Sequence, residues 1–120
     1  MMTPQQMAEQ IVGVVAQKIG RDIKMLHISS ITVIADYFVI CTANSTTQIK
    51  NLCDEIEKNM EDSGENLLHR EGYREGGWVL LDYGCVIVHV FLEEAREFYS
   101  LERLWQDAED IDISHLVGER

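Results

Sequence analysis

The sequence predicts a single α/β domain in which a mixed β-sheet carries its long helices on one face. Three observations support this prediction: a length of 120 residues, an apolar content of 46%, and helical and strand patterns that alternate along the chain. A chain of this size forms one domain and buries roughly two-thirds of its unfolded surface. The predicted order is helix, strand, strand, helix, three strands and a final helical region, which is typical of an α/β layout.

The first element is a helix within residues 3–19. Thr3 is suited to cap this helix, Pro4 to occupy its first position, and Gln6 has the spacing of a capping box. Apolar residues then recur at helical spacing, and Gly20 is expected to end the helix.

Two strands and a second helix are expected next. The strands are 23–29 and 36–42, and the apolar residues of the second face both ways, which indicates an inner strand covered on both faces. Ser45 and Gln48 then have capping-box spacing, and an amphipathic apolar stripe follows them.

A hairpin is the most apolar part of the chain. A short strand, 66–70, precedes it, and its own strands are 78–82 and 86–91. Tyr83 and Gly84 lie near its turn, where Gly84 is suited to a positive φ angle.

The remainder of the chain is predicted as one or two short helices followed by an acidic segment. Acids fall in the first helical turn, but residues from about 109 are too polar for an element to be assigned. We therefore expect a domain over 1–108 and an acidic tail over 109–120 with the composition of a flexible segment.

The net charge of −11 is concentrated in the second half of the chain. Residues 1–60 carry five Lys or Arg against six Asp or Glu, whereas residues 61–120 carry five against fifteen. An acidic surface repels phosphates, so we expect little direct RNA binding. A basic protein partner is the natural complement, and charge that only aids solubility is the alternative.

Cysteine usage and hydropathy indicate a cytoplasmic location. Cys41, Cys53 and Cys85 form an odd set without a CxxC pair, which predicts reduced thiols in the core and no disulfide framework or zinc site. No apolar run reaches the ~18 residues of a membrane helix, and no basic region precedes an apolar run near residue 1. We expect no membrane contact.

Catalytic signatures are absent from the sequence. The glycine-rich segment 71–77 lacks the spacing of GxGxxG or a P-loop, no GxSxG occurs, and the histidines lack metal-ligand spacing. We predict a protein that is not an enzyme, without cofactor or metal, in which His89 is a neutral, hydrogen-bonded side chain. The alternative is a metal-dependent enzyme that uses Asp36, Asp82 and His89.

The first hairpin strand has two apolar faces, and one of them is a candidate recognition surface. Period-two geometry divides its side chains into two sets that point apart: Trp78, Leu80 and Asp82 against Val79, Leu81 and Tyr83. In one interpretation, one set lies in the core and the other forms a patch that binds a partner. In the other interpretation, helices cover both faces of the strand. The sequence leaves both interpretations open, although large aromatic side chains are typical of binding hot spots.

Three stretches closely resemble the ribosomal silencing factor family, also called Iojap-like proteins. They are ADYFVICTANSTTQIKNLCDEIE (35–57), EGYREGGWVLLDYGCVIVHVF (71–91) and REFYSLERLWQDAE (96–109). The resemblance spans roughly 5–108 and implies a nucleotidyltransferase-like fold without the catalytic residues. By analogy with that fold, the metal-dependent alternative becomes a cryptic nucleotidyltransferase-like enzyme. It also implies binding to the large ribosomal subunit through ribosomal protein fourteen, steric exclusion of the small subunit, repression of translation and a role in large-subunit biogenesis.

The resemblance also assigns the partner-binding surface to Trp78, Leu80, Leu81, Asp82 and Tyr83. Aromatic and leucine side chains would bury area, while acids, including Glu93 and Glu94 nearby, would complement a basic ribosomal protein. Cys85 stands where family members usually carry an acid, which removes one potential salt bridge. A homodimer of the free protein through the same patch is a further alternative.

Overall fold

The sheet has six strands in the order β3-β4-β5-β2-β1-β6 in the computed structural model, which describes residues 2–74, 77–99, 103 and 105–117. The strands are β1 (Arg21–His27), β2 (Tyr37–Ala43), β3 (His69–Glu71), β4 (Trp78–Asp82), β5 (Val86–Leu92) and β6 (Glu109–Asp110). Strands β2 and β5 pair in parallel and the other neighbours pair antiparallel. The predicted mixed sheet is therefore confirmed.

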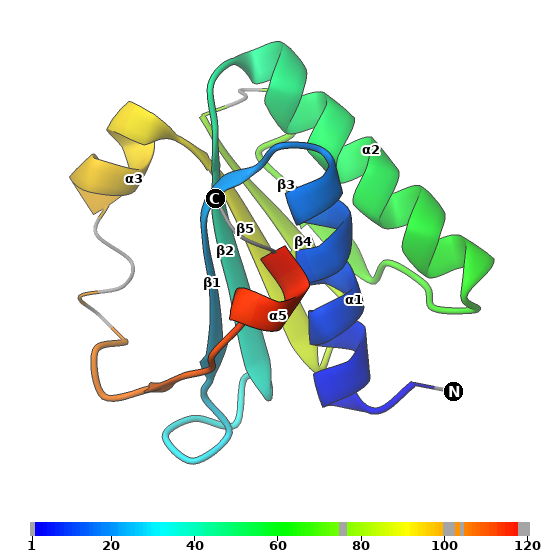
Figure 1. Cartoon of the computed structure of the whole chain (residues 1–120), viewed down its shortest axis with the longest axis vertical. Coiled ribbons are helices and arrows are strands. Elements are labelled where there is room, and N and C mark those ends of the chain that lie inside the picture. Colours follow the sequence, from blue (N-terminus) through cyan, green and yellow to red (C-terminus); the bar gives the residue numbers. More distant parts are fainter. Residues whose placement is uncertain (1, 75–76, 100–102, 104, 118–120) are drawn as a thin grey trace.

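Two long helices, α1 (Pro4–Gln17) and α2 (Thr46–Asp62), cover one face of the sheet, as Figure 1 shows. We call this side the helix-covered face. Its core is aliphatic, and Ile11, Ile56 and Val88 are among its fully buried members. The predicted placement of both long helices on one face is confirmed, as is the burial of every residue of β2.

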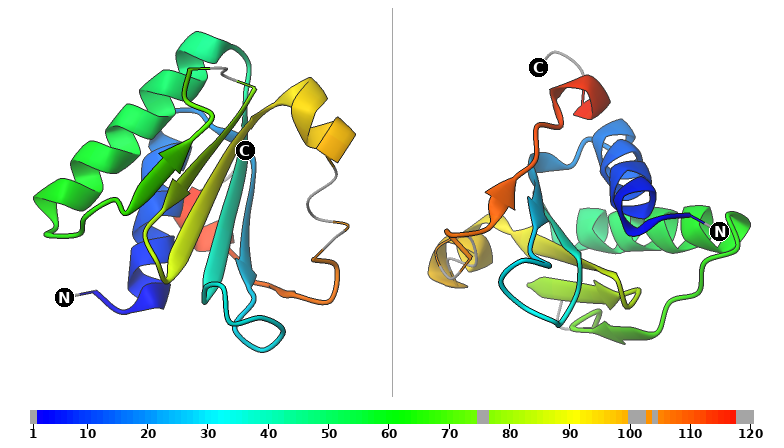
Figure 2. Two further views of the ribbon diagram at one scale, coloured as in Figure 1. Left: turned by 180° about the vertical axis from the view of Figure 1, so that it is seen from behind. Right: turned by 90° about the horizontal axis from the view of Figure 1, so that it is seen from below.

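The opposite side of the sheet is aromatic. Figure 2 shows α1 and α2 on one side of the sheet and the short helix α3 (Glu93–Tyr99) on the other. We define the aromatic face by the side chains that cluster there on β2, β4 and β5: Phe38, Trp78, Leu80, Asp82, Ile87, His89 and Phe91. The helices therefore divide the sheet into two chemically different sides.

The start of α1 is confirmed, whereas its end differs from the prediction. Thr3 Oγ1 accepts from the Gln6 N–H at 3.1 Å, and Gln6 Oε1 accepts from the Thr3 N–H at 2.9 Å. The left-handed residue after the helix is Ile19, with φ 63°, and not Gly20. A Cβ at Gly20 would lie 2.2 Å from Val15 Cγ1, so glycine is required there for close packing.

Strand boundaries agree with the sequence within two residues, apart from β3. The sequence predicts a strand over 66–70, but only His69–Glu71 pair with β4. Leu67 and Leu68 gave that segment its apolar character, yet they lie before the paired residues.

The segment predicted as an acidic tail contains two elements as far as Val117. Strand β6 pairs with the end of β1, and helix α5 (Ser114–Val117) packs near α1. This segment is mostly acidic, and its few apolar residues form a pattern too short to predict a helix or a strand. Its apolar side chains nevertheless pack on the helix-covered core: Ile111, Ile113, Leu116 and Val117.

No helix in the described part of the chain is both long and apolar enough to cross a bilayer.

Candidate partner-binding surface

Strand β4 divides its side chains between the two faces of the sheet. Val79 and Leu81 are fully buried in the helix-covered core. Trp78, Leu80 and Asp82 are half-buried and lie on the aromatic face. The predicted period-two division is confirmed, and it identifies which set is core.

Two predicted contact residues, Leu81 and Tyr83, belong to the core set. Leu81 is 0% exposed and Tyr83 is 7% exposed, so neither side chain is available to a partner in this conformation. Burial raises the pKa of the Tyr83 phenol. Its hydroxyl has no hydrogen-bond partner among the described residues. The candidate surface therefore retains Trp78, Leu80 and Asp82.

Trp78 is fixed in place by two neighbours on β5. Its Nε1–H donates to His89 Nδ1 at 3.1 Å, and its indole stacks on Phe91 with 4.9 Å between the ring centroids. A donor at Nδ1 requires the neutral imidazole, and burial lowers the pKa of His89 to about 4. The prediction of a neutral, hydrogen-bonded His89 is confirmed.

The Trp78–His89 pair itself was missed by sequence reasoning. The hairpin turn places Asp82 opposite Ile87, and the antiparallel register then places Leu80 opposite His89 and Trp78 opposite Phe91. Residues diagonal across two strands are within reach of aromatic side chains. The length of the turn was therefore the signal that could have found this pair.

A second tryptophan completes the aromatic cluster. Phe38 of β2 lies edge-on to His89 with ring centroids 4.8 Å apart, and edge-on to Trp105 with centroids 5.0 Å apart. Trp105 and Ala108 pack on the part of the face near β1 and β2, while Trp78 and Leu80 contribute from β4. At the β4 end of the face, Trp78 and Leu80 remain partly exposed.

Asp82 has a structural role in addition to its charge. Its Oδ1 accepts from the Gly84 N–H at 2.7 Å, and Gly84 has the predicted positive φ, 86°. Cys85 follows in this turn as a half-buried free thiol, and its carbonyl accepts from the N–H groups of Asp36 and Tyr37. Burial raises the pKa of the Cys85 thiol.

The residues of the alternative enzyme site are not assembled into a metal centre. Strand β5 lies between the strand that follows Asp36 and the strand that ends at Asp82. His89 Nδ1 is occupied by Trp78. Within residues 2–74, 77–99, 103 and 105–117, no group of three or more His, Cys, Asp or Glu could hold a metal ion.

The other two cysteines are buried and free, as the sequence predicts. Burial raises the pKa of both Cys41 and Cys53 to about 12, so they stay protonated thiols at neutral pH.

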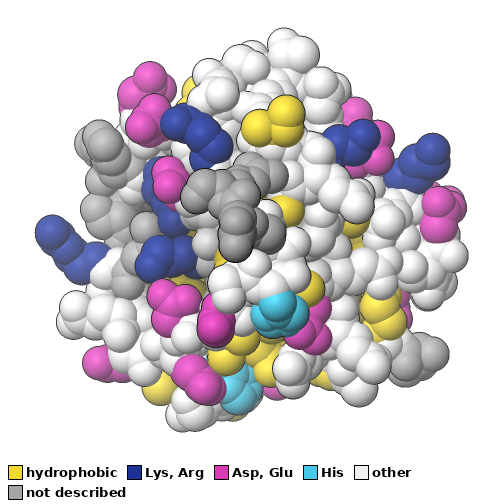
Figure 3. Space-filling view, viewed as in Figure 1, with side chains coloured by type: hydrophobic (Ala, Val, Ile, Leu, Met, Phe, Trp, Pro, Cys, Tyr) yellow, Lys and Arg dark blue, Asp and Glu magenta, His cyan; other side chains and the backbone are white. Residues whose placement is uncertain are grey.

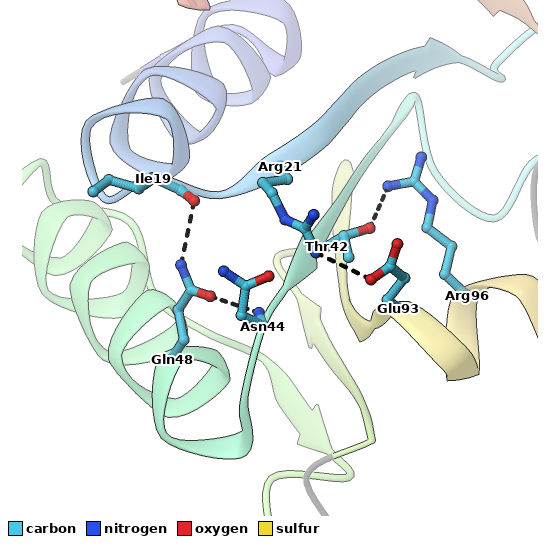
Figure 4. A network of polar contacts seen from close by, with 7 residues as sticks. All are labelled: Ile19, Arg21, Thr42, Asn44, Gln48, Glu93 and Arg96. Atoms are coloured by element: carbon cyan, nitrogen blue, oxygen red, sulfur yellow. Dashed lines mark hydrogen bonds and ion pairs between the residues drawn. The ribbon is translucent and has the colours of Figure 1, made fainter.

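The start of α3 is attached to the sheet by a polar network, shown in Figure 4. Glu93 forms an ion pair with Arg21 at 3.4 Å, and the buried Arg96 donates to Thr42 Oγ1 at 2.8 Å and to the Asp22 carbonyl. Glu93 therefore has a partner within the chain, while Glu94 is exposed. This network holds α3 at one end of the aromatic face.

The same figure shows how the two long helices are joined. Ser45 Oγ, which the figure does not draw, accepts from the Gln48 N–H at 3.1 Å, and this confirms the predicted cap. The Gln48 amide differs from a capping box, because its oxygen accepts from the Asn44 N–H and its nitrogen donates to the Ile19 carbonyl. Gln48 thus links the start of α2 to the end of α1.

The fold and surface define a class of small α/β domains whose sheet is covered by helices on one face and carries an aromatic cluster on the other. Residues 1–120 match the family model described as ribosomal silencing factor during starvation. The chain belongs to the ribosomal silencing factor family, which confirms the resemblance.

Similar proteins from two bacteria carry the same family name. The chain is 34% identical over 117 residues to the ribosomal silencing factor of Halalkalibacterium halodurans, covering 98% of this chain and 100% of that protein. It is 41% identical over 96 residues to that of Bacillus subtilis, covering 80% and 81%. A mouse relative, mitochondrial assembly of ribosomal large subunit protein 1, is 28% identical over 100 residues, covering 81% and 44%.

Two crystal structures show the same fold. A protein from Chromobacterium violaceum aligns with a TM-score of 0.85 at 30% identity, covering 88% of each chain. A protein from Bacillus halodurans aligns with a TM-score of 0.80 at 32% identity, covering 90% of this chain and 98% of that one. The predicted single-domain α/β fold is confirmed.

Proposed function

We propose that this protein binds the large ribosomal subunit through ribosomal protein fourteen and sterically blocks association with the small subunit. Translation in the cytoplasm is thereby repressed, and the same binding assists large-subunit biogenesis. The observation that carries the proposal is the half-buried set Trp78, Leu80 and Asp82 on the aromatic face. Family membership and the ribosomal names of the relatives support it.

The proposed surface has the physical properties of a protein-binding site. Trp78 is held by His89 and Phe91, so little side-chain freedom is lost when a partner packs against the indole. Leu80 adds apolar area beside it.

The charges of this region suit a basic partner. Residues 77–95 contain three acids, Asp82, Glu93 and Glu94, and no Lys or Arg. A basic ribosomal protein would be attracted by this field, which raises the rate of association at low salt.

The proposed action needs occupancy and no chemical step. Steric exclusion requires only that the protein stay bound where the small subunit must dock. Silencing should therefore follow the fraction of large subunits that carry the protein, and saturate at one copy per subunit.

The test measures binding of purified large subunits by sedimentation, and subunit joining by light scattering. Leu80→Ala should weaken binding by about tenfold if Leu80 is a hot spot, and about ten times more of the variant should be needed to block subunit joining. Asp82→Asn keeps an oxygen for the Gly84 N–H and removes the charge, so it should slow association and reduce its salt dependence.

A matched control for the charge is Glu61→Gln, at an exposed position near the end of α2. It should leave binding unchanged. If Leu80→Ala and Asp82→Asn both bound large subunits as the unmodified protein does, the proposed surface would be wrong.

A further inference from the structure

Exposed aliphatic side chains gather in one loop between β1 and β2. Five large hydrophobic side chains are exposed in the described part of the chain, and three of them, Ile31, Val33 and Ile34, fall within four residues. Single exposed apolar residues are ordinary, but a cluster indicates an interaction site. We call residues 29–34 the apolar loop.

The apolar loop is supported by local hydrogen bonds and by buried residues at both of its ends. The N–H groups of Ile31 and Thr32 both donate to the Ile28 carbonyl at 3.0 Å, and the Ile34 N–H donates to Thr32 Oγ1 at 3.2 Å. Ile28 and Ala35, on either side of the loop, are buried. Its apolar side chains are therefore presented on an ordered support, which lowers the entropy lost on binding.

The apolar loop is continuous with the aromatic face. Ile28 and Ala35 belong to the same hydrophobic cluster as Trp78 and Leu80. The Asp36 N–H, just after the loop, donates to the Cys85 carbonyl in the turn that follows β4. In Figure 2, the left view shows the loop projecting beyond the end of the sheet, and the right view shows it on the side away from α1 and α2.

The charge around the loop favours a basic partner over a second copy of this chain. Residues 27–36, 82–87 and Glu109 meet at this end of the sheet and contain three acids, Asp36, Asp82 and Glu109, and no Lys or Arg, while Asp110 beside them is paired with Lys24. On the side shown in Figure 3, Lys and Arg side chains lie in the upper and middle parts of the molecule, and the lowest part shows acids, histidines and apolar groups. Two copies joined here would bring acids against acids, which is unfavourable.

We propose that the apolar loop is a second contact of the docking surface and inserts Ile31, Val33 and Ile34 into an apolar depression on a basic ribosomal protein. This inference rests on the proposed function and deepens it. The surface then has two parts, the β4 set Trp78, Leu80 and Asp82, and the loop, joined across the buried Ile28 and Ala35.

The experiment compares four proteins for binding to purified large subunits: the unmodified chain, Leu80→Ala, the double variant Val33→Ser with Ile34→Ser, and Ile19→Ser. Ile19 is 66% exposed and Ile34 is 60% exposed, so Ile19→Ser is a control of matched size and exposure at the end of α1. Because the substituted loop side chains are exposed, the double variant should fold normally, which circular dichroism and thermal melting verify.

The double variant should bind large subunits at least about tenfold more weakly, while Ile19→Ser binds as the unmodified chain does. If the double variant bound normally and Leu80→Ala bound weakly, the inference would be overturned and the proposed function would stand. If the unmodified chain did not bind large subunits at all, the proposed function would fail. If the double variant changed only the oligomeric state on a sizing column, a second copy would be the occupant and the inference would be overturned.

Discussion

The helix-covered face and the aromatic face of the sheet differ in composition and in how completely they are buried. Val79 and Leu81 are fully buried in an aliphatic core beneath α1 and α2. Trp78 and Leu80, their neighbours on the same strand, are half-buried beside aromatic rings. Because side chains alternate along a strand, five residues serve both faces. The core residues and the proposed recognition residues of β4 are thus divided by face of the sheet, and not by segment of the chain.

The largest difference in stability between the two faces is expected from Leu81→Ala. The substitution removes a fully buried side chain under the helices and leaves a cavity, which should lower the free energy of unfolding by about 2–5 kcal/mol. Chemical denaturation measures this loss. Leu80→Ala is the matched control on the neighbouring residue, and it should cost roughly 1 kcal/mol because Leu80 is already partly exposed. Equal losses for the two variants would contradict the division between the faces.

A second prediction concerns the pH dependence of the aromatic face. Burial lowers the pKa of His89 from 6.5 to about 4. Between these values the unfolded chain binds the proton more readily, so the contribution of His89 is complete above pH 6.5 and is lost as the pH falls toward 4. The loss should reach about 3 kcal/mol, and protonated Nδ1 can no longer accept from Trp78.

The measurement is the free energy of unfolding against pH for the unmodified protein and for His89→Gln. Glutamine offers Trp78 an amide oxygen and does not titrate, while the carboxylates titrate alike in both proteins. The difference between the two curves therefore isolates His89. Parallel curves between pH 7 and 4 would show that this imidazole is not buried in its neutral form.

A smaller effect is expected from Trp78→Phe. Phenylalanine keeps a ring to stack on Phe91 but has no N–H for His89 Nδ1, so a buried acceptor loses this donor. The free energy of unfolding should fall by about 1–2 kcal/mol. Trp105→Phe is the control, since it removes an indole from the same face at the edge of Phe38. If Trp105→Phe lowered the free energy of unfolding as much as Trp78→Phe does, the Trp78–His89 hydrogen bond would not be a specific source of stability.

Local sequence signals predicted most of the fold. Thr3, Pro4 and Gln6 fixed the start of α1, and Gly84 fixed the hairpin turn, because each acts on its own immediate backbone. The two-sided apolar pattern of 36–42 likewise predicted an inner strand, and all of β2 is buried. Such features need no knowledge of distant residues.

The candidate site depended on contacts between distant residues and was predicted only in part. Strand β4 is apolar on both faces, so its sequence could not show that the helices cover Leu81 and Tyr83 and leave Leu80 accessible. The Trp78–His89 hydrogen bond follows from the register of the hairpin. The two residues of β6 form a strand by pairing with the edge of β1, which is distant in the sequence. The burial of β4 side chains, the Trp78–His89 bond and the pairing of β6 are all determined by tertiary packing, which a local sequence pattern does not reveal.

The smallest effect is expected at the end of α1, on the helix-covered side. Two residues after α2, Gly64 has φ 83°, and two residues after α1, Ile19 has φ 63°. The N–H group that follows each of them donates to a carbonyl five residues back, Met60 for α2 and Val15 for α1. A left-handed conformation is strained for a β-branched residue and unstrained for glycine. Ile19→Gly should therefore raise the free energy of unfolding by about 1 kcal/mol, net of the greater freedom of glycine in the unfolded chain.

Val33→Gly is the control for Ile19→Gly, and it should change the free energy of unfolding in the opposite direction. Val33 is also an exposed β-branched residue, but it does not have a positive φ, so glycine there only adds freedom to the unfolded chain. That variant should lose about 0.5–1 kcal/mol. The bond from Gln48 to the carbonyl of residue 19 uses the backbone and survives the substitution at Ile19. A higher free energy of unfolding for Ile19→Gly, together with a lower one for Val33→Gly, would show that the backbone of Ile19 is strained. A lower free energy of unfolding for both variants would show that Ile19 has an ordinary conformation.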